Sequence, residues 1–441
     1  MWRFLTYMDN SGLYVGLDIG TTSIKVIVAE KVKGQLNVIG VGNAPSNGLS
    51  RGVIVDIDQA AEAIKSAVNQ AQEKASIEIK DVVVSVPANM LRIEDCNGLI
   101  TLDDQSREIT DEDVQNVVAS ALGTSLPQER EVIDIQPEEF IVDGFDDIKD
   151  PRGMVGVRLE MRGKLITGSK SIMHNLKKAV EKAGLTIIST VLTPLAEGHE
   201  MLDDGHQDFG TIIIDLGGGQ TTASVIHDHE LKYATTDPEG GEYITKDISI
   251  VLNTSMENAE KIKRDYGYAD SLQASADNEF PVDIVGQAEP KYIDERYLAE
   301  IIEARLSQIF DRIKNHLDQI RALELPGGIV LTGGVAALPG IAELAADQFN
   351  VNVSVYIPDQ MGLRHPSFTA GLSLVSYFSD LSDVDMIVRS AVGATSTKIS
   401  KLTNAQNNQV PVSSKSEKQK PKTQKKKRGE GIKSFFSDFF D

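Results

Sequence analysis

Residues 14–30, YVGLDIGTTSIKVIVAE, and residues 211–228, TIIIDLGGGQTTASVIHD, are two copies of one pattern. In each copy an apolar run ends in Asp, a further apolar residue and Gly follow, and a second run rich in β-branched residues comes next. This pattern predicts a β-hairpin. Asp18 aligns with Asp215, a separation of roughly 200 residues, whereas solenoid repeats are only about 20 to 50 residues long. We therefore expect two similar domains that face one another.

The residues at the two hairpin tips suit phosphate and a divalent cation. Glycine lets backbone N–H groups approach an anion closely, and hydroxyl or amide side chains add further donors. The tip residues of these kinds are Gly20, Thr21, Thr22, Gly217, Gly218, Gly219, Gln220 and Thr221. The carboxylates of Asp18 and Asp215 would hold Mg²⁺ through its water shell, and Lys25 can reach the same phosphates as a point charge. Two such tips across a cleft would clamp a metal-bound polyphosphate.

A single Asp-x-Gly turn is also common as plain turn chemistry, so the duplication matters more than either copy. A third glycine-rich element supports the nucleotide interpretation. Residues 327–341, GGIVLTGGVAALPGI, read as a buried strand, a Thr-Gly-Gly turn and a helix that starts near Pro339. A strand-to-helix turn of this kind gives close backbone approach to a nucleotide, although a lone Gly-Gly would be weak evidence.

These three segments resemble, in order, the phosphate 1, phosphate 2 and adenosine motifs of the actin, Hsp70 and sugar-kinase superfamily. That resemblance implies an α/β actin-like fold of two ribonuclease-H-like domains with a nucleotide cleft between them. Within the superfamily, residues 125–144 (SLPQEREVIDIQPEEFIVDG) and 149–160 (KDPRGMVGVRLE) resemble the inserted subdomain of the FtsA family of bacterial cell-division proteins. The resemblance runs from about residue 14 to residue 378 and resumes at the C-terminal tail.

The resemblance implies a site for ATP and Mg²⁺ and assigns its residues. The phosphates and the metal would be served by Asp18, Gly20, Thr21, Thr22 and Lys25, and the opposite wall would be formed by Asp215, Gly217, Gly218, Gly219, Gln220 and Thr221. Gly240 and Gly241 resemble the turn beneath the nucleotide, and Gly333 and Gly334 would lie against the adenosine. Glu260 and Lys263 sit where relatives contact ribose and adenine from a helix, with a solvated helix face as the alternative.

The chain departs from the family pattern at Thr193. Some filament-forming relatives place an acidic residue just before a Pro to position the attacking water, and Thr193 is a poor general base. Glu197 lies nearby but one turn onward. We therefore expect nucleotide binding with slow or negligible hydrolysis, so that at most weak ATPase activity accompanies assembly.

The resemblance also implies a domain organisation. The expected parts are 12–85 and 166–209 as domain one, 86–165 as the inserted subdomain, 210–241 and 326–390 as domain two, 242–325 as its smaller subdomain, 391–424 as a disordered linker and 425–441 as an amphipathic helix. Within these parts we expect a helix near 169–182, a strand at 186–192, a charged loop near 270–290 and a long helix within 292–317. Most apolar residues of that long helix recur at helical spacing, which predicts that they are core.

The C-terminal tail predicts contact with a membrane. Five apolar residues fall at i, i+3, i+4, i+7 and i+8 on one helical stripe, namely Ile432, Phe435, Phe436, Phe439 and Phe440. A cationic block precedes them, formed by Lys425, Lys426, Lys427 and Arg428. This pairing is typical of a helix in the headgroup region of an anionic bilayer, and the polar stretch 395–424 reads as a tether to it. The alternative is a helix docked on the protein's own body or on a partner.

Composition and net charge narrow the classes of partner and the location that we expect for the protein. The formal net charge of −21 argues against nucleic acid as a partner, because its phosphates demand a basic surface. The body is acidic and only the stretch from Lys415 to Arg428 is basic, so only the tail suits anionic lipid. The single cysteine, Cys96, excludes an internal disulfide, and neither a membrane-spanning run nor a secretory signal is evident. We expect a peripheral protein on the cytoplasmic side of the membrane, at the division septum.

FtsA relatives use the smaller subdomain to bind the C-terminal peptide of the tubulin-like protein FtsZ, and Arg305 matches a position implicated by that resemblance. A guanidinium would suit the acidic peptide. The neighbours three and four positions away are not acidic, which disfavours an ion pair within the helix but leaves a solvated arginine whose stem covers apolar surface. Further expected partners are other copies of the chain in an actin-like filament, anionic lipid, and possible later division proteins.

The function expected from these features is that of an ATP-binding, actin-like division protein that polymerises at the membrane and anchors the FtsZ ring. One alternative is an ATP-dependent small-molecule kinase of the same fold, which the phosphate tips alone do not exclude. The inserted subdomain and the amphipathic tail favour the division protein. A second alternative, a chaperone of the Hsp70 type, would require a substrate-binding domain after the nucleotide domain.

Overall fold

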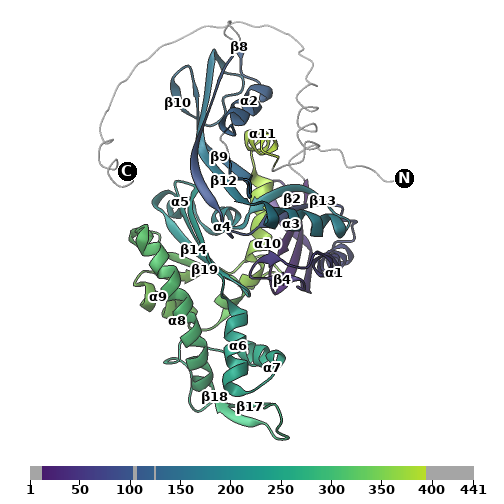
Figure 1. Cartoon of the computed structure of the whole chain (residues 1–441), viewed down its shortest axis with the longest axis vertical. Helices are drawn as coiled ribbons and strands as arrows, with labels where there is room; N and C mark the ends of the chain where they lie inside the picture. Colours follow the sequence, from purple (N-terminus) through teal and green to yellow (C-terminus); the bar gives the residue numbers. More distant parts are fainter. Residues whose placement is uncertain (1–11, 103–106, 124–125, 394–441) are drawn as a thin grey trace. The chain divides into compact units, whose positions relative to one another are not determined.

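Two five-stranded sheets with one common strand order are the centre of the fold in the computed structural model, which describes residues 12–102, 107–123 and 126–393 (Figure 1). The first sheet has the order β3-β2-β1-β6-β13 and the second β16-β15-β14-β19-β20. In each sheet the first two pairings are antiparallel and the last two are parallel. The predicted duplication and the actin-like fold class are therefore confirmed.

The two predicted hairpins are the first two strands of each sheet in chain order. The strands of the first sheet are β1 (Gly12–Ile19), β2 (Ser23–Val32), β3 (Gln35–Pro45), β6 (Asp81–Val86) and β13 (Thr186–Leu192). Those of the second are β14 (Thr211–Leu216), β15 (Thr221–His227), β16 (Glu230–Asp237), β19 (Ile329–Thr332) and β20 (Val353–Val355). Asp18 pairs with Lys25 across the first hairpin and Asp215 with Thr222 across the second, so both aspartates lie next to a tip.

Helices cover the first sheet because their apolar residues recur along one face. α1 (Ile57–Ala75) begins at the N-cap Asp56, whose carboxylate accepts from the backbone N–H groups of Asp58 and Gln59. Its buried face includes Ile64 and Val68, which pack in one hydrophobic core with the strands. Further helices along the chain before the second sheet are α3 (Lys170–Lys182), α4 (Thr193–Met201) and α5 (Asp204–Phe209), and a short pair, β4 (Leu49–Ser50) and β5 (Val53–Ile54), precedes α1.

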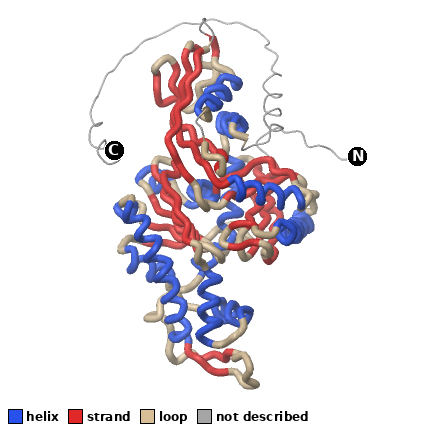
Figure 2. Tube along the Cα trace, viewed as in Figure 1, coloured by secondary structure: helices blue, strands red, loops and turns tan. Residues whose placement is uncertain are grey.

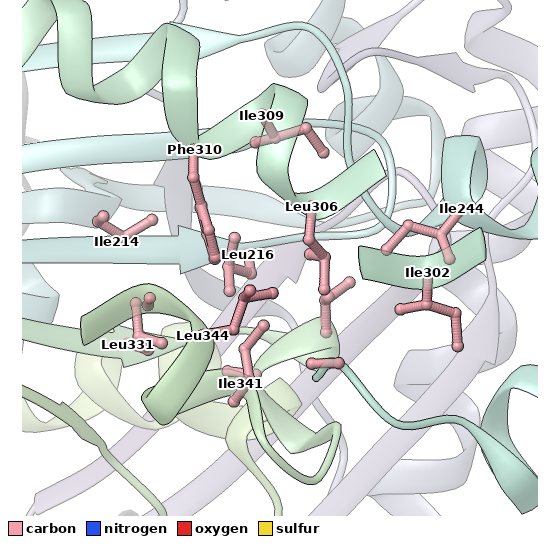
Figure 3. Close-up of a cluster of buried hydrophobic side chains, with 14 of the residues drawn as sticks. Ile214, Leu216, Ile244, Ile302, Leu306, Ile309, Phe310, Leu331, Ile341 and Leu344 are labelled. Atoms are coloured by element: carbon pink, nitrogen blue, oxygen red, sulfur yellow. The ribbon is translucent and has the colours of Figure 1, made fainter. Parts of the chain in front are cut away.

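The second half has one continuous core that joins its sheet to a helical subdomain. This subdomain contains α6 (Gly241–Leu252), α7 (Met256–Tyr266), β17 (Glu279–Val282), β18 (Lys291–Asp294) and α8 (Glu295–Gln319), and α9 (Ile341–Phe349) flanks the sheet. Figure 3 shows Phe310 of α8 next to strand residues Ile214 and Leu216, and Ile302 of the same helix close to Ile244 of α6. The long helix therefore holds sheet and subdomain together, because its two ends bury side chains against different neighbours.

The inserted subdomain is a four-stranded antiparallel sheet, ordered β10-β9-β12-β7, with one helix packed on it. Its elements are β7 (Arg92–Thr101), β8 (Arg107–Glu108), α2 (Asp111–Ala121), β9 (Arg130–Val142), β10 (Phe145–Ile148), β11 (Val155–Gly156) and β12 (Arg158–Ser169). Figure 2 shows that this part consists mainly of strands, whereas residues 241–319 are mainly helical. Each of the two similar domains thus carries an additional subdomain, and the two subdomains differ in secondary structure.

The end of the described chain differs from the expected domain plan. We expected residues 326–390 to belong to domain two, but α10 (Thr369–Asp380) packs on β1, β2 and α4 of the first half. α11 (Asp383–Ala391) shares a core with the inserted subdomain through Val384, Ile387 and Val388. The physical reason is that the apolar faces of both helices match the first half, with Leu372 and Val375 of α10 buried against Ile27. The other expected domain bounds stay predictions.

Two further differences are local. The charged loop expected near 270–290 contains β17, which pairs with β18, so the long helix begins at Glu295 rather than within 292–294.

None of the helices in the described part of the chain is long and apolar enough to cross a membrane. The tail helix predicted at 425–441, and the linker apart from residues 391–393, lie outside the described residues.

A buried ion pair fastens α11 to the rest of the first half. The Arg389 guanidinium donates to the Asp134 carboxylate of β9 and to the Thr190 carbonyl of β13. The two charged residues are only 3 % and 1 % exposed, respectively. Each buried charge is stabilised by the other. Replacing one partner should therefore lower the free energy of unfolding more than replacing both.

We expect Arg389→Met to lower the free energy of unfolding by about 3–5 kcal/mol, since Asp134 would stay buried without a cation. The double variant Arg389→Met/Asp134→Leu should recover most of that loss, because no charge then remains buried. Urea unfolding of the full chain would measure both values. A double variant as unstable as the single one would contradict this role for the pair.

Candidate functional site

The two hairpin tips touch one another across a cleft. A Cβ placed on Gly218 would lie 2.3 Å from the Thr22 methyl carbon, and one on Gly219 would lie 2.4 Å from that of Thr21. Both distances are far below van der Waals contact, so any larger residue at these two positions would push the tips apart. The glycines of the second tip are therefore required by the approach of the first tip.

A cavity of about 1040 Å³ extends from the tips between the two halves of the fold. Most of the predicted nucleotide residues line it, namely Asp18, Gly20, Thr21, Thr22, Lys25, Asp215, Gly217, Gly218, Gly219, Gln220, Gly241, Glu260, Lys263, Gly333 and Gly334. Gly240 and Thr221 do not. They support the wall instead, since the Thr221 hydroxyl donates to the Glu239 carbonyl and Gly240 is the N-cap of α6. The size is that of a drug-sized ligand site.

The N-terminus of α6 is tied directly to the second tip. The backbone N–H groups of Gly241 and Glu242 donate to the carbonyls of Gly217 and Gly218 at 2.9 Å and 2.8 Å. The helix therefore begins at the cavity wall, where its dipole favours negative charge. This arrangement agrees with a site for phosphate groups.

Two aspartates near the strand ends form an acidic part of the cavity wall. The Ser85 hydroxyl donates to Asp18 at 3.1 Å, and the Lys25 ammonium lies 3.9 Å from the same carboxylate. Burial and the neighbouring charge of Asp18 raise the pKa of Asp215 to about 6, although Lys25 acts in the opposite direction. The two carboxylates repel one another, so a divalent cation between them would lower the free energy of the ionised pair.

Glu197 adds a third carboxyl group that sequence reasoning placed only nearby. It lies on α4, lines the cavity with Thr193 and is 2 % exposed. Burial first, and then the charges of Asp215 and Asp18, raise its pKa well above the usual value. The helical spacing from Thr193 was the available signal, because four residues bring a side chain back to the same helix face.

The described residues fit Mg²⁺ through water or shared phosphate rather than through direct ligation. No group of three or more His, Cys, Asp or Glu residues in 12–102, 107–123 and 126–393 is close enough to hold a metal ion by itself. Mg²⁺ commonly keeps several waters and takes one or two carboxylates plus substrate phosphates. Asp18 and Asp215 supply hard oxygen donors of the kind this ion prefers.

The cavity wall also contains a buried lysine. Lys263 of α7 is 8 % exposed, so the alternative of a solvated helix face does not hold for it. Its ammonium donates to the Gly241 carbonyl at 2.9 Å and the Thr245 hydroxyl at 2.7 Å, and it lies 2.6 Å from the Glu260 carboxylate. Burial lowers the pKa of Lys263 despite the nearby Glu260. The pair is thus positioned by α6 and α7 together.

Gly333 lies where only glycine is tolerated. Its φ is +89°, and a Cβ there would lie 2.2 Å from an Asp215 carboxylate oxygen. Residues other than glycine avoid this backbone conformation. The predicted Thr-Gly-Gly turn is confirmed as the segment after β19, but a short 3₁₀ turn, Gly334–Ala337, comes next and α9 begins only at Ile341.

Side chains also bridge the two halves at the cavity mouth. The Asn89 amide donates to Gln220 at 2.8 Å, and the Arg51 guanidinium donates to the Tyr243 hydroxyl at 3.1 Å. Each contact joins a residue of the first half to one of the second. The closed arrangement is therefore held by direct hydrogen bonds as well as by the tips.

Arg305 is paired within the chain rather than solvated. Its guanidinium forms two bonds with Asp247 of α6, at 2.6 and 3.0 Å, and a third with Glu239 at 3.0 Å. It also lies over the ring of Tyr243, 5.7 Å from the centroid. The ion pair is with other segments, which is why the acidic partners were not visible from neighbouring positions of its own helix.

Comparison with known proteins finds two matching family models. The family model described as cell division protein FtsA matches residues 212–373, and the model described as the SHS2 domain inserted in FtsA matches residues 88–167. A cell division protein FtsA of Enterococcus hirae is 54 % identical over 98 % of this chain and 100 % of its own length.

Solved structures of other actin-like proteins share the fold. MreB5 of Spiroplasma citri bound to ADP superposes with a TM-score of 0.52 and 14 % identity over 83 % of this chain and 95 % of its own. The MamK double helical filament gives a TM-score of 0.51 and 15 % identity over 84 % and 99 %. At such identities the similarity concerns the fold alone.

We expect Gly333→Ala to destabilise the chain by about 1–3 kcal/mol, because the backbone conformation is strained for alanine and the Cβ meets Asp215. Gly334→Ala is the matched control, since its Cβ would lie 3.8 Å from the nearest atom, an ordinary contact. Denaturant unfolding of both variants measures the difference. Equal loss from the two substitutions would show that the turn does not need glycine at Gly333.

Proposed function

This chain belongs to the FtsA family of cell division proteins, and we propose that it binds ATP with Mg²⁺, polymerises, and anchors the FtsZ ring to the cytoplasmic face of the membrane at the septum. The observation that carries the proposal is the cavity bounded by two matching hairpin tips, with one aspartate next to each. Family membership supports a division protein over a small-molecule kinase, and so does the inserted subdomain.

In the proposed site the chain's own residues bind and orient the nucleotide. Backbone N–H groups at the glycine tips would face the phosphates, with Lys25 as the nearby cation, while the first N–H groups of α6 hold the second tip in place. Lys263 and Glu260 would contact the ribose and base, and Gly333 and Gly334 would let the adenosine approach the backbone. Mg²⁺, when bound, would neutralise phosphate charge beside Asp18 and Asp215.

We further propose that polymerisation makes the membrane contact strong enough to matter. Five apolar side chains at 1.5–3 kcal/mol each on full burial, and less at an interface, give about the reversible attachment of a single weak anchor. A filament presents many such tails at once, so assembly raises the avidity without any new contact. Actin-like neighbours such as the MamK filament support self-association as a property of this fold.

The membrane proposal predicts that the full chain sediments with anionic vesicles, more strongly with ATP, and that a chain ending at Gln424 stays in the supernatant. Phe435→Glu should also abolish sedimentation although it keeps the basic block, because it places a charge on the apolar stripe. Co-sedimentation with phosphatidylglycerol vesicles measures all three forms. Equal pelleting of the full and shortened chains would remove the anchor from the proposal.

The proposed FtsZ contact at Arg305 has to compete with contacts inside the chain. An acidic peptide would replace Asp247 or Glu239, or share the guanidinium with them. We therefore expect peptide affinity to depend on the internal partners as well as on Arg305. That dependence distinguishes a binding arginine from a purely structural one.

Arg305→Ala should weaken binding of the FtsZ C-terminal peptide by about 10- to 100-fold, since a charge-assisted hydrogen bond is lost. Asp247→Asn should strengthen binding, because it frees the guanidinium from its tightest internal partner. Arg312→Ala is the matched control, two turns along the same helix and also bonded to Glu239. Fluorescence anisotropy of a labelled peptide measures each affinity, and unchanged binding to Arg305→Ala would exclude the contact.

A further inference from the structure

Glu197 is a buried carboxyl group with an unpartnered oxygen in the wall of the nucleotide cavity. The residue is 2 % exposed, and its Oε1 atom has no hydrogen-bond partner. α4 supplies it from the first half of the fold, four residues after Thr193. Buried polar groups in proteins are normally hydrogen-bonded, so an unpartnered carboxyl oxygen calls for a ligand or a function.

The fold satisfies buried acids elsewhere. Asp134 is 1 % exposed and receives the Arg389 guanidinium, which is itself buried. Glu260 receives Lys263 at 2.6 Å and lines the same cavity. Glu197 therefore differs from these two other carboxylates of the described chain, because its oxygen Oε1 has no partner although the residue lines the cavity.

The charges around Glu197 are mostly negative. Asp215 and Asp18 are the two charged groups that act on it, and both raise its pKa. Lys25 is the cation beside this cluster, and its ammonium is 3.9 Å from Asp18 and bonded to the Ser23 hydroxyl at 2.8 Å. Three carboxyl groups thus share one ammonium in a space removed from water, where charge interactions are strong.

A nucleotide polyphosphate entering this cleft without a cation would add more negative charge to the cluster. A divalent cation on the phosphates would reverse the sign of the interaction, because the carboxylates would then face a positive ion or its water shell. We propose that Glu197 makes the cleft discriminate between free and cation-loaded nucleotide, by supporting the water shell of the cation that only the latter brings. This role rests on the proposed nucleotide binding.

This role is separate from that of the two aspartates. Asp18 and Asp215 stand at matching positions of the duplicated hairpins, whereas Glu197 comes from a helix and has no counterpart in the hairpin repeat. A purely structural Glu197 would fill space and contribute equally to binding with and without the cation. The two roles therefore predict different ratios of the nucleotide affinity with the cation to the affinity without it. A change in affinity alone would not separate them.

The test measures the dissociation constant of a fluorescent ATP analogue for the full chain, once with excess Mg²⁺ and once with EDTA. In the unaltered chain the affinity should be much higher with Mg²⁺. Glu197→Gln keeps the shape but cannot ionise beside the cation, so it should weaken binding in Mg²⁺ and leave binding in EDTA nearly unchanged. We expect the ratio of the two dissociation constants to fall by about tenfold or more, because a carboxylate at short range from the cation is lost in a partly dry site.

Two further variants keep the result interpretable. Glu197→Ala, which removes the carboxyl by a different route, should lower the same ratio. Glu200→Gln is the matched control, one turn along α4, where the carboxylate accepts from the Tyr356 hydroxyl at 3.0 Å and does not line the cavity. Its ratio should stay that of the unaltered chain.

An unchanged ratio in both Glu197 variants would overturn the inference while leaving nucleotide binding in place. An equal loss of affinity in Mg²⁺ and in EDTA would also overturn it, since that is the behaviour of a structural residue. Failure of the unaltered chain to bind the analogue under either condition would contradict the proposed function, and the inference with it.

Discussion

The approach of the two hairpin tips is the constraint on which the rest of the structure depends. Gly218 and Gly219 have no side chain where Thr21 and Thr22 arrive, so the two halves meet at van der Waals distance. This contact places the strand ends, and with them the aspartates, on opposite sides of one cavity. It also explains why Gly218 and Gly219 of the second tip stand opposite two threonines of the first, whereas Gly217 and Gly20 are each required by a carbonyl of their own tip. The duplicated tips are complementary rather than identical, because two bulky tips would not close and two bare ones would supply fewer side-chain donors.

A second set of contacts links the second tip to the helical subdomain. Glu239 precedes the N-cap of α6, and its carboxylate receives both Arg305 and Arg312 of α8. The carbonyl of the same residue receives the Thr221 hydroxyl at the second tip. The α8 helix also carries a hydrophobic core that continues from the sheet to α6 (Figure 3). Movement of α8 relative to the tip would therefore have to break charged hydrogen bonds and a packed core together, so α8 and the cavity wall behave as one structural unit.

The parts of the fold that depend on local pattern could be predicted from the sequence, and those that depend on distant partners could not. Both hairpins, the helix near 170–182 and the long helix followed from the spacing of apolar residues, and the tip glycines followed from the duplication. The partners of Arg305 did not, because Asp247 and Glu239 are brought to it by the fold and not by its own helix. The packing of α10 and α11 could not be predicted for a similar reason. An amphipathic helix shows which face is apolar but not which surface it covers, and here that surface lies hundreds of residues earlier in the chain.

The contrast between two buried carboxylates separates what stabilises this fold from what it is built to bind. Asp134 and Arg389 are both almost fully enclosed, and their opposite charges remove the need for any outside partner. Glu197 is enclosed to the same degree, yet its free oxygen faces a cavity whose other acids only add to the repulsion. A fold that can place an arginine against one buried acid could satisfy another in the same way. At the tips, Lys25 is the cation beside three carboxyl groups. Positive charge is therefore in deficit there. A cation that arrives with the nucleotide has the charge required to remove that deficit.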